Sequence, residues 1–337
     1  MPTPGRTTAS SPADGGGWSH SGTQSGTEST ALALLALHSG RIVTKAGVSP
    51  LMATQRTDGL WCAVGDEATG NFWATGLAVN TLLTLNAKPA SYVHSLEVLV
   101  RGCPLEASWL VRLKFRISDR HVQFNPKKYG WPWVPDTLSW VLPTSMALIA
   151  LQRAKERGLV CGRELAARLR LGIEMLLDRA YPQGGWNAGN AVVYGVPLRP
   201  HVAATALAVA ALQVHYNLPM VRTSLTWLMR NVECESPHSL AWLILAAYTY
   251  KDVSEDIRPA VDKARNRLAS LVEDPRTIED AATLALAALA LAAQCHASIV
   301  GRQGPRSPMP DARPRTRGIY FLELCGCCPR ILTSPEL

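Results

Sequence analysis

The sequence predicts an all-α protein in which repeated helical hairpins stack to form an inner and an outer ring. Short helices that are apolar almost all round recur along the chain, and several follow a turn that contains Gly and Trp. Longer helices with an apolar stripe on one side alternate with them. Because an entirely apolar helix must be buried and a striped helix covers a core, we expect neighbouring hairpins to complete one another's core.

The apolar helices share a Thr or Ser close to their first turn. These anchor residues are Thr30, Thr75, Thr144, Thr205, Ser239 and Thr283. We predict the inner helices at residues 27–37, 72–85, 144–152, 203–212, 239–247 and 283–291. The third follows an aromatic loop at residues 130–133 and begins beside Pro143, a position where the first turn of a helix tolerates proline.

The more polar helices form the predicted outer ring, at residues 91–102, 163–179, 220–231 and 254–273. In the second of these, apolar residues recur at intervals of three and four, which places them on one side of a helix. They are Leu165, Leu169, Ile173, Leu176 and Leu177. Arginines occupy other positions of the same segment, so this helix is expected to lie between the core and solvent.

One segment departs from the helical pattern. Residues 111–117 alternate apolar and basic side chains, which is typical of a strand, and Asp119 and Arg120 could form a turn into residues 121–124. We therefore predict an inserted β-hairpin at residues 109–124. Its basic face, formed by Arg112, Lys114 and Arg116, is either solvated or part of a flap that attracts a pyrophosphate or another anion.

The two ends of the chain lack helical periodicity. Residues 1–16 are rich in Pro, Gly, Ser and Thr, and the last forty residues contain a Pro/Arg-rich stretch. We predict that residues 1–16 and 298–337 are disordered and that residues 17–297 form one helical domain.

The composition excludes some classes of function. The net charge is +8, but no block of Lys and Arg with interleaved aromatic residues occurs, so nucleic-acid binding is not expected. Attraction to an anionic membrane surface is compatible with this charge. No apolar run is long enough to span a bilayer, no apolar leader segment begins the sequence, and most of the eight cysteines are isolated. We therefore expect a cytoplasmic protein with reduced thiols, either free or peripheral to a membrane.

The Gly-Trp turns carry a family resemblance. The sequence Gln55-Arg-Thr-Asp-Gly59-Leu-Trp61 resembles the QW repeat of triterpene cyclases, and Gly184-Gly-Trp186 is a degenerate copy. The whole pattern resembles the prenyltransferase and squalene oxidase repeat of squalene-hopene cyclases, oxidosqualene cyclases and protein prenyltransferase β subunits. The resemblance implies an α/α toroid of about six helical hairpins. In that repeat the Gln and Trp side chains link neighbouring hairpins. The simpler interpretation of the tryptophans is therefore a packing role.

The resemblance also indicates where an acid would lie. Squalene-type cyclases protonate an alkene with the middle Asp of an Asp-x-Asp-Asp-Thr-Ala motif, two residues before the Thr. In this chain that position holds Glu28, Trp73, Leu142, Ala203, Pro237 and Ala281. Only Glu28 is acidic. It is a candidate general acid, with stabilisation of the first helical turn by its charge as the alternative.

Further candidates come from the loops that would surround one end of the ring. Asp136 lies in an aromatic loop, where a raised pKa would make it a second candidate acid, unless it only caps a turn. Trp and Tyr rings could stabilise a carbocation. The candidate ligand-binding residues are Trp61, Trp131, Trp133, Trp186 and His201.

No metal or cofactor is predicted. A magnesium-dependent prenyl enzyme would need an Asp-Asp-x-x-Asp cluster, which is absent from the sequence. His238 matches the zinc-binding His of protein prenyltransferase β subunits, and Cys234 lies nearby, but the Asp-x-Cys part of that site is missing.

These observations lead to two hypotheses of different class. The first is a terpenoid cyclase-like toroid that binds an isoprenoid or a similar apolar ligand and catalyses cyclisation or prenyl transfer without the usual acidic motif. The second is a non-catalytic toroid module that binds a protein or a lipid. The sequence does not determine the oligomeric state.

Overall fold

The computed structural model describes residues 26–42, 47–64, 69–118, 124–193, 196–234, 236–250, 257–274, 276–278 and 280–293. In these residues the fold is all-α apart from one antiparallel pair of two-residue strands, β1 (Val192–Val193) and β2 (Val196–Pro197). The predicted disordered segments, residues 1–16 and 298–337, lie outside the described residues. No helix in the described part of the chain is long and apolar enough to cross a membrane.

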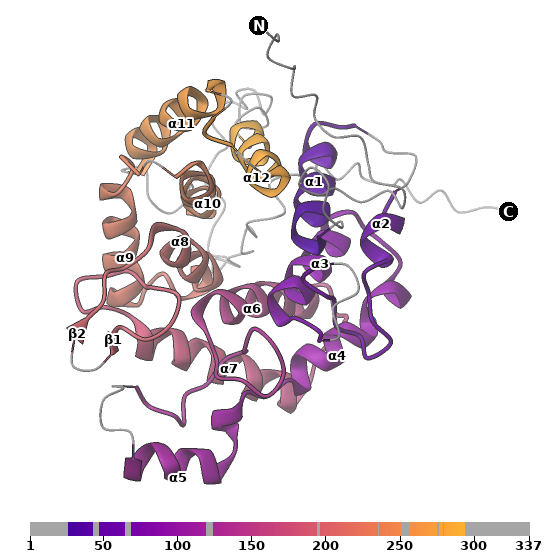
Figure 1. Cartoon of the computed structure of the whole chain (residues 1–337), viewed down its shortest axis with the longest axis vertical. Coiled ribbons are helices and arrows are strands. Elements are labelled where there is room, and N and C mark those ends of the chain that lie inside the picture. The colour runs from indigo at the N-terminus through magenta and orange to yellow at the C-terminus, as the bar shows by residue number, and fades with distance from the viewer. Residues whose placement is uncertain are drawn as a thin grey trace, which may run out of the picture.

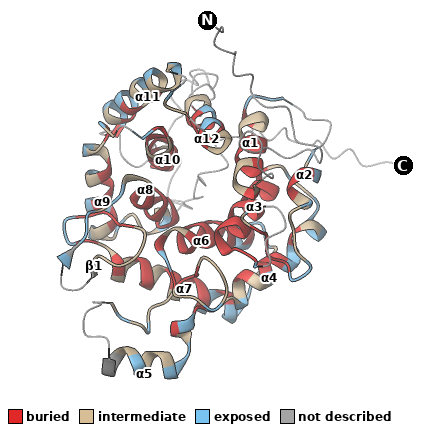
Figure 2. Ribbon diagram, in the orientation of Figure 1, coloured by how far each residue is buried: buried red, intermediate tan, exposed pale blue. Residues whose placement is uncertain are grey.

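Six helices of the described residues form a closed inner ring. They are α1 (Thr27–Ser39), α3 (Phe72–Thr84), α6 (Val141–Glu156), α8 (Val202–Ala211), α10 (Pro237–Tyr248) and α12 (Ala281–Ala292). Each packs against the next, and α12 packs against α1 (Figure 1). The ring is the core of the protein: every residue of α3 is buried, and the other inner helices are mostly buried (Figure 2). The α/α toroid and its inner helices are confirmed.

The outer helices lie between consecutive inner helices in sequence. They are α2 (Ser49–Met52), α4 (Val93–Arg101), α7 (Arg163–Arg179), α9 (Pro219–Arg230) and α11 (Arg258–Glu273), with short 3-10 turns η1 (Pro89–Ser91), η2 (Leu105–Ala107) and η3 (Gln213–His215). Helix α7 packs on α6, α9 on α8, and α11 on α10 and α12. The buried residues Leu165, Leu169 and Leu176 of α7 belong to the predicted stripe. Each outer helix thus covers the ring with its apolar side.

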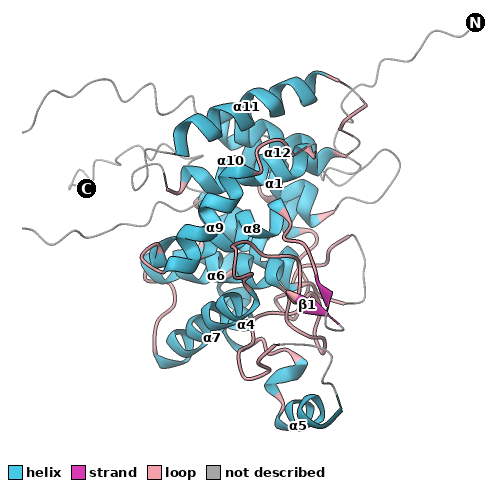
Figure 3. Ribbon diagram, turned by 90° about the vertical axis from the view of Figure 1, so that its left-hand side faces the viewer, coloured by secondary structure: helices cyan, strands magenta, loops and turns pink. Residues whose placement is uncertain are grey.

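The predicted β-hairpin at residues 109–124 is wrong. Residues Trp109–Ser118 form a helix, α5, which extends away from the ring (Figures 1 and 3). Trp109, Leu110 and Leu113 are exposed on it. The alternation of apolar and basic residues misled the prediction because it normally reports a half-buried strand. A lone hairpin is marginally stable, whereas a helix pairs its backbone groups within one segment, and Leu, Arg and Lys are good helix formers.

The Gly-Trp turns and the anchor residues form a structural unit that is repeated three times. The backbone N–H groups of Trp61, Trp131 and Trp186 donate to the hydroxyls of Thr75, Thr144 and Thr205, each at 2.9 Å. The indole N–H groups donate to the carbonyls of Leu51, Leu99 and Leu176 at 2.8, 2.8 and 2.6 Å. Each tryptophan therefore joins the start of an inner helix to the segment before the turn.

This unit bears on three of the candidate ligand-binding residues. Trp61, Trp131 and Trp186 have no exposed surface. Their polar atoms bond to the protein and their rings lie in the core, so they cannot contact a ligand without unpacking the ring. The ligand-binding prediction for these three residues is corrected to the packing role.

Candidate functional site

The starts of the inner helices gather at one end of the ring. The N–H of Thr27, at the start of α1, donates to the carbonyl of Ala63 in the loop before α3, at 3.0 Å. The N–H of Phe72, at the start of α3, donates to the carbonyl of Trp133 in the loop before α6, at 2.8 Å. The N–H of Val141, at the start of α6, donates to the carbonyl of Ala188 before α8, at 2.9 Å. These bonds align the first turns of successive inner helices, together with the loops that precede them.

Glu28 lies at this end, in the first turn of α1. Burial raises the pKa of its carboxyl group, and the negative charge of Asp280 raises it further. A hydrogen bond with the Trp73 side chain lowers it again. The indole N–H is the only donor of that side chain, so Trp73 holds one oxygen of the carboxyl group. The structure therefore places a carboxyl group with a raised pKa in contact with an indole.

Trp73, the partner of Glu28, belongs to a cluster of three tryptophans. The ring of Trp73, at the start of α3, lies 6.0 Å from that of Trp133 and 6.2 Å from that of Trp242 on α10, between centroids. The second pair is edge-on, at 75°. Helices α3 and α10 are opposite members of the ring, so Trp73 and Trp242 meet across its middle. Glu28 is thus linked through Trp73 to a largely buried aromatic cluster contributed by three elements.

His238 and Asp280 complete the group. The indole of Trp242 donates to Nε2 of His238 at 3.0 Å, which requires that nitrogen to be an unprotonated acceptor. Burial lowers the pKa of His238, against the opposing charge of Asp280. The imidazole is therefore neutral near pH 7, with its proton on Nδ1. Asp280 caps α12 by accepting from the N–H of Thr283 at 2.7 Å.

The structure places the remaining predicted site residues in different parts of the molecule. Glu28 and Trp133 come together at the end of the ring. Asp136 is exposed, in a left-handed backbone conformation with φ of 59°, and does not lie in the buried aromatic setting that its candidacy as an acid required. His201 is also exposed and lines a separate pocket with Arg179 and Trp140.

Two contributors to the site were not predicted. Trp73 occupies the same repeat position as Glu28, two residues before its anchor Thr, so the alignment of the repeats contained a signal for its placement. Since α1 and α3 are neighbours in the ring, equivalent positions on them lie side by side. Trp242 had no such signal, because its contact with Trp73 depends on the diameter of the closed ring.

No metal centre is formed by the part of the chain that the structure describes. Nowhere in it do three His, Cys, Asp or Glu side chains gather closely enough to hold an ion. His238 is engaged with Trp242, and Cys234 lies before the start of α10.

The arrangement of its helices makes the chain an α/α toroid, and the comparisons with known proteins add no assignment to this class. The sequence matches no protein family model and no curated protein sequence. Its backbone is similar to that of cellobiose 2-epimerase from Spirochaeta thermophila, with a TM-score of 0.48 and 10% identity over 77% of this chain and 78% of the other.

Two further solved structures show a comparable level of similarity. A reducing-end-xylose releasing exo-oligoxylanase, solved with xylose, gives a TM-score of 0.45 at 12% identity, covering 80% of this chain and 82% of that chain. The α2-macroglobulin of E. coli gives 0.43 at 12% identity, covering 79% of this chain and 15% of that chain. At these values no functional assignment follows from any of the three.

Proposed function

We propose that the Glu28 end of the ring is a general-acid site for an apolar, electron-rich ligand of the isoprenoid class, and that the protein is a terpenoid cyclase-like enzyme. The observation that carries this proposal is the Glu28 carboxyl group, which has a raised pKa and is held by Trp73, whose ring lies against the partly buried ring of Trp133. A protonated carboxylic acid next to aromatic faces is suited to protonating a carbon–carbon double bond.

In the proposed reaction, the Glu28 proton forms a new C–H bond with the π electrons of an alkene. The other alkene carbon becomes positive, and Glu28 becomes a carboxylate. The indole faces of Trp73 and Trp133 stabilise the cation through their π electrons. After ring closure within the ligand, a neighbouring C–H bond breaks and returns a proton to Glu28, so the overall reaction is an isomerisation.

The environment of Glu28 favours such a cycle. Its carboxylate, once formed, would lie near the negative charge of Asp280, which opposes ionisation and favours return of the proton. His238 is held neutral by burial and by its bond from Trp242, so it does not supply a cation that would favour the carboxylate. Cyclisation is favoured over prenyl transfer because the site contributes an acid.

The test is a substitution of the proposed acid. The protein is incubated with squalene, farnesyl pyrophosphate and geranylgeranyl pyrophosphate, and products are identified by mass spectrometry. We expect Glu28→Gln to lower product formation by at least about a hundredfold, in line with the usual contribution of general acid catalysis. Glu164→Gln is the matched control, because Glu164 also lies in the first turn of a helix but is exposed.

The pH profile gives a second readout of the same proposal. The reactive form of Glu28 is protonated, and its pKa lies above the ordinary value of 4.5. We therefore expect turnover to persist above pH 4.5 and to fall as the pH rises through the raised pKa. Turnover that Glu28→Gln leaves intact, or absence of turnover with all three substrates, would contradict the proposal.

Helix α5 supports a second proposal, that the toroid is a non-catalytic module that contacts an anionic membrane surface. Trp109, Leu110 and Leu113 are 64%, 59% and 43% exposed, and Arg112 and Lys114 lie on the same helix. Exposed apolar residues with flanking cations are typical of helices that lie in the membrane interface.

Co-sedimentation with vesicles tests the second proposal. We expect binding to vesicles rich in phosphatidylserine and not to neutral ones, and loss of most of this binding in the double variant Leu110→Ser, Leu113→Ser. Val214→Ser removes an exposed apolar side chain elsewhere, on η3, and should change nothing. Equal binding by the double variant and the control would exclude α5 as the contact.

A further inference from the structure

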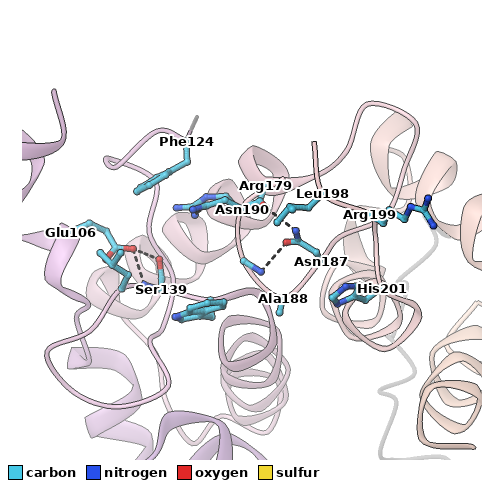
Figure 4. Close-up of a pocket in the computed structure, with 13 residues that line it drawn as sticks. Glu106, Phe124, Ser139, Arg179, Asn187, Ala188, Asn190, Leu198, Arg199 and His201 are labelled. Carbon is cyan, nitrogen blue, oxygen red and sulfur yellow. Dashed lines mark hydrogen bonds between the residues drawn. The ribbon is translucent and has the colours of Figure 1, made fainter. Parts of the chain in front are cut away.

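A second site lies at the same end of the ring but on its other side. It is a pocket of about 340 Å³ bounded by η2, the end of α7 and the loops that precede α6 and α8 (Figure 4). Trp140, Leu138 and Leu198 contribute apolar walls, and Arg199 and His201 also line it. It shares no residue with the group around Glu28, so its role does not depend on the function proposed for that group.

The first polar group of the pocket is the carboxylate of Glu106. This side chain is fully buried. Its Oε1 atom accepts hydrogen bonds from the backbone N–H of Ser139, at 2.9 Å, and from the Ser139 hydroxyl. Its Oε2 atom is buried and has no hydrogen-bond partner in the described structure. A buried carboxylate oxygen without a donor is costly, so this atom is set up to accept a bond from a bound group.

The second polar group is the guanidinium of Arg179, at the end of α7. Its side chain is only 3% exposed and points across the pocket toward Glu106 (Figure 4). The ring of Phe124 covers one face of the guanidinium at 4.0 Å, and Nη1 donates to Asn190. Its Nε atom makes no hydrogen bond and lies 3.7 Å from Asp178, and Nη2 has no partner. Nε and Nη2 form the edge that arginine uses for carboxylates; Asp178 lies beside its Nε end, and Nη2 remains for a second acceptor.

Glu106 and Arg179 do not neutralise one another directly. Their side chains form no ion pair within 4.0 Å. Burial lowers the pKa of Arg179 to about 10, and the charge of Asp178 and, less strongly, that of Glu106 oppose this shift. Oε2 of Glu106 and Nη2 of Arg179, which both lack a hydrogen-bond partner, therefore belong to side chains that line one pocket (Figure 4). A ligand that bonds to both atoms must present an acceptor to Arg179 and a donor to Glu106.

We propose that this pocket binds a small carboxylate that carries an ammonium or hydroxyl group next to the carboxyl carbon, as in a 2-amino or 2-hydroxy acid. The carboxylate of the ligand pairs with Nη2 of Arg179, and the neighbouring donor bonds to Oε2 of Glu106. The apolar side chain of the ligand lies against Trp140, which is 39% exposed, and Leu198. The volume is at the lower end of the range of about 300–1,000 Å³ for small-molecule sites, which suits a ligand of amino-acid size.

Calorimetric titration of the full chain tests this proposal. The probes are L-leucine, L-phenylalanine and the 2-hydroxy acids with the same side chains, with glucose as a neutral polyol. We expect at least one of the carboxylates to bind, and we expect Arg179→Gln to lower its affinity at least tenfold. Arg170→Gln is the control on the same helix, since Arg170 is 67% exposed and should leave the affinity unchanged.

Glu106→Gln distinguishes the two donors and keeps the shape of the side chain. This substitution should weaken the affinity for an amino acid at least tenfold, because the ammonium group loses its charged partner. The affinity for a hydroxy acid should fall by less. Circular dichroism and the melting temperature report whether each variant folds. If Arg179→Gln does not fold, Trp140→Ala, at the exposed wall of the pocket, replaces it as the test variant. Binding of glucose alone, binding of no probe, or carboxylate binding that folded Glu106→Gln and Trp140→Ala variants retain would overturn the proposal.

Discussion

At the scale of single residues, the fold depends on polar atoms that bond across element boundaries inside an apolar core. The hydroxyls of Thr75, Thr144 and Thr205 each accept from a tryptophan N–H in the preceding turn. Arg153, which is 1% exposed, donates to the carbonyl of Asn80 at 3.0 Å and to the Thr84 hydroxyl at 3.0 Å. Such bonds satisfy buried groups that would otherwise oppose burial.

The indole bond of Trp61 provides a residue-scale prediction. Trp61→Phe removes the donor to the Leu51 carbonyl and leaves a void in the core. The Leu51 carbonyl keeps a bond from the Thr54 hydroxyl at 3.0 Å, so we expect the free energy of unfolding to fall by about 1 kcal/mol for the lost bond, with a further loss from the void. Urea denaturation measures this change in the free energy of unfolding. Trp109→Phe, the same change at an exposed position, should stay within about 0.5 kcal/mol, and a similar loss in both variants would contradict the structural role.

At the scale of elements, hydrophobic periodicity predicted the ring helices well. The outer helix at residues 163–179 coincides with α7, and the ends of the inner helices lie within four residues of their predicted positions. Both kinds of helix are recognisable because burial of one whole surface or of one stripe leaves a local pattern. Helix α5 was mispredicted because it contacts little of the core, so no burial constraint shaped its pattern.

The candidate site was only partly predictable from local patterns. Glu28 was identified because it occupies an acidic position that a family resemblance indicates, and the repeat alignment placed Trp73 at an equivalent position. His238 was considered as a zinc ligand, whereas the structure pairs it with Trp242. Glu106 and Arg179 were missed, because neither lies in a recognisable motif and only the tertiary structure brings both to one pocket.

At the scale of the whole molecule, closure of the ring is the decisive event. Helix α12 packs against α1, although the two are far apart in sequence. This contact brings Asp280 within electrostatic range of Glu28. In an open stack of the same hairpins, Glu28 and Asp280 would lie at opposite ends.

Closure leads to a prediction about cooperativity. Leu35→Ala, at a fully buried position on α1, should destabilise the protein by about 2–5 kcal/mol. Because α1 and α12 are in contact, hydrogen exchange should then accelerate in α12 as well as in α1. Leu113→Ala, on the exposed helix α5, is the control and should accelerate neither. Unchanged protection of α12 in Leu35→Ala would indicate that the ring is not closed in solution.

The sequence by itself determined which helices are buried, in what order they alternate, and which residues join each turn to its inner helix. These properties depend on local periodicity and on short-range spacing, so they are written into consecutive residues. Only the tertiary structure decided that Trp73 meets Trp242, that Asp280 approaches Glu28, and that Glu106 faces Arg179. Those contacts depend on the curvature and closure of the ring, which arise from the sum of packing between all the helices and leave no pattern in any one segment.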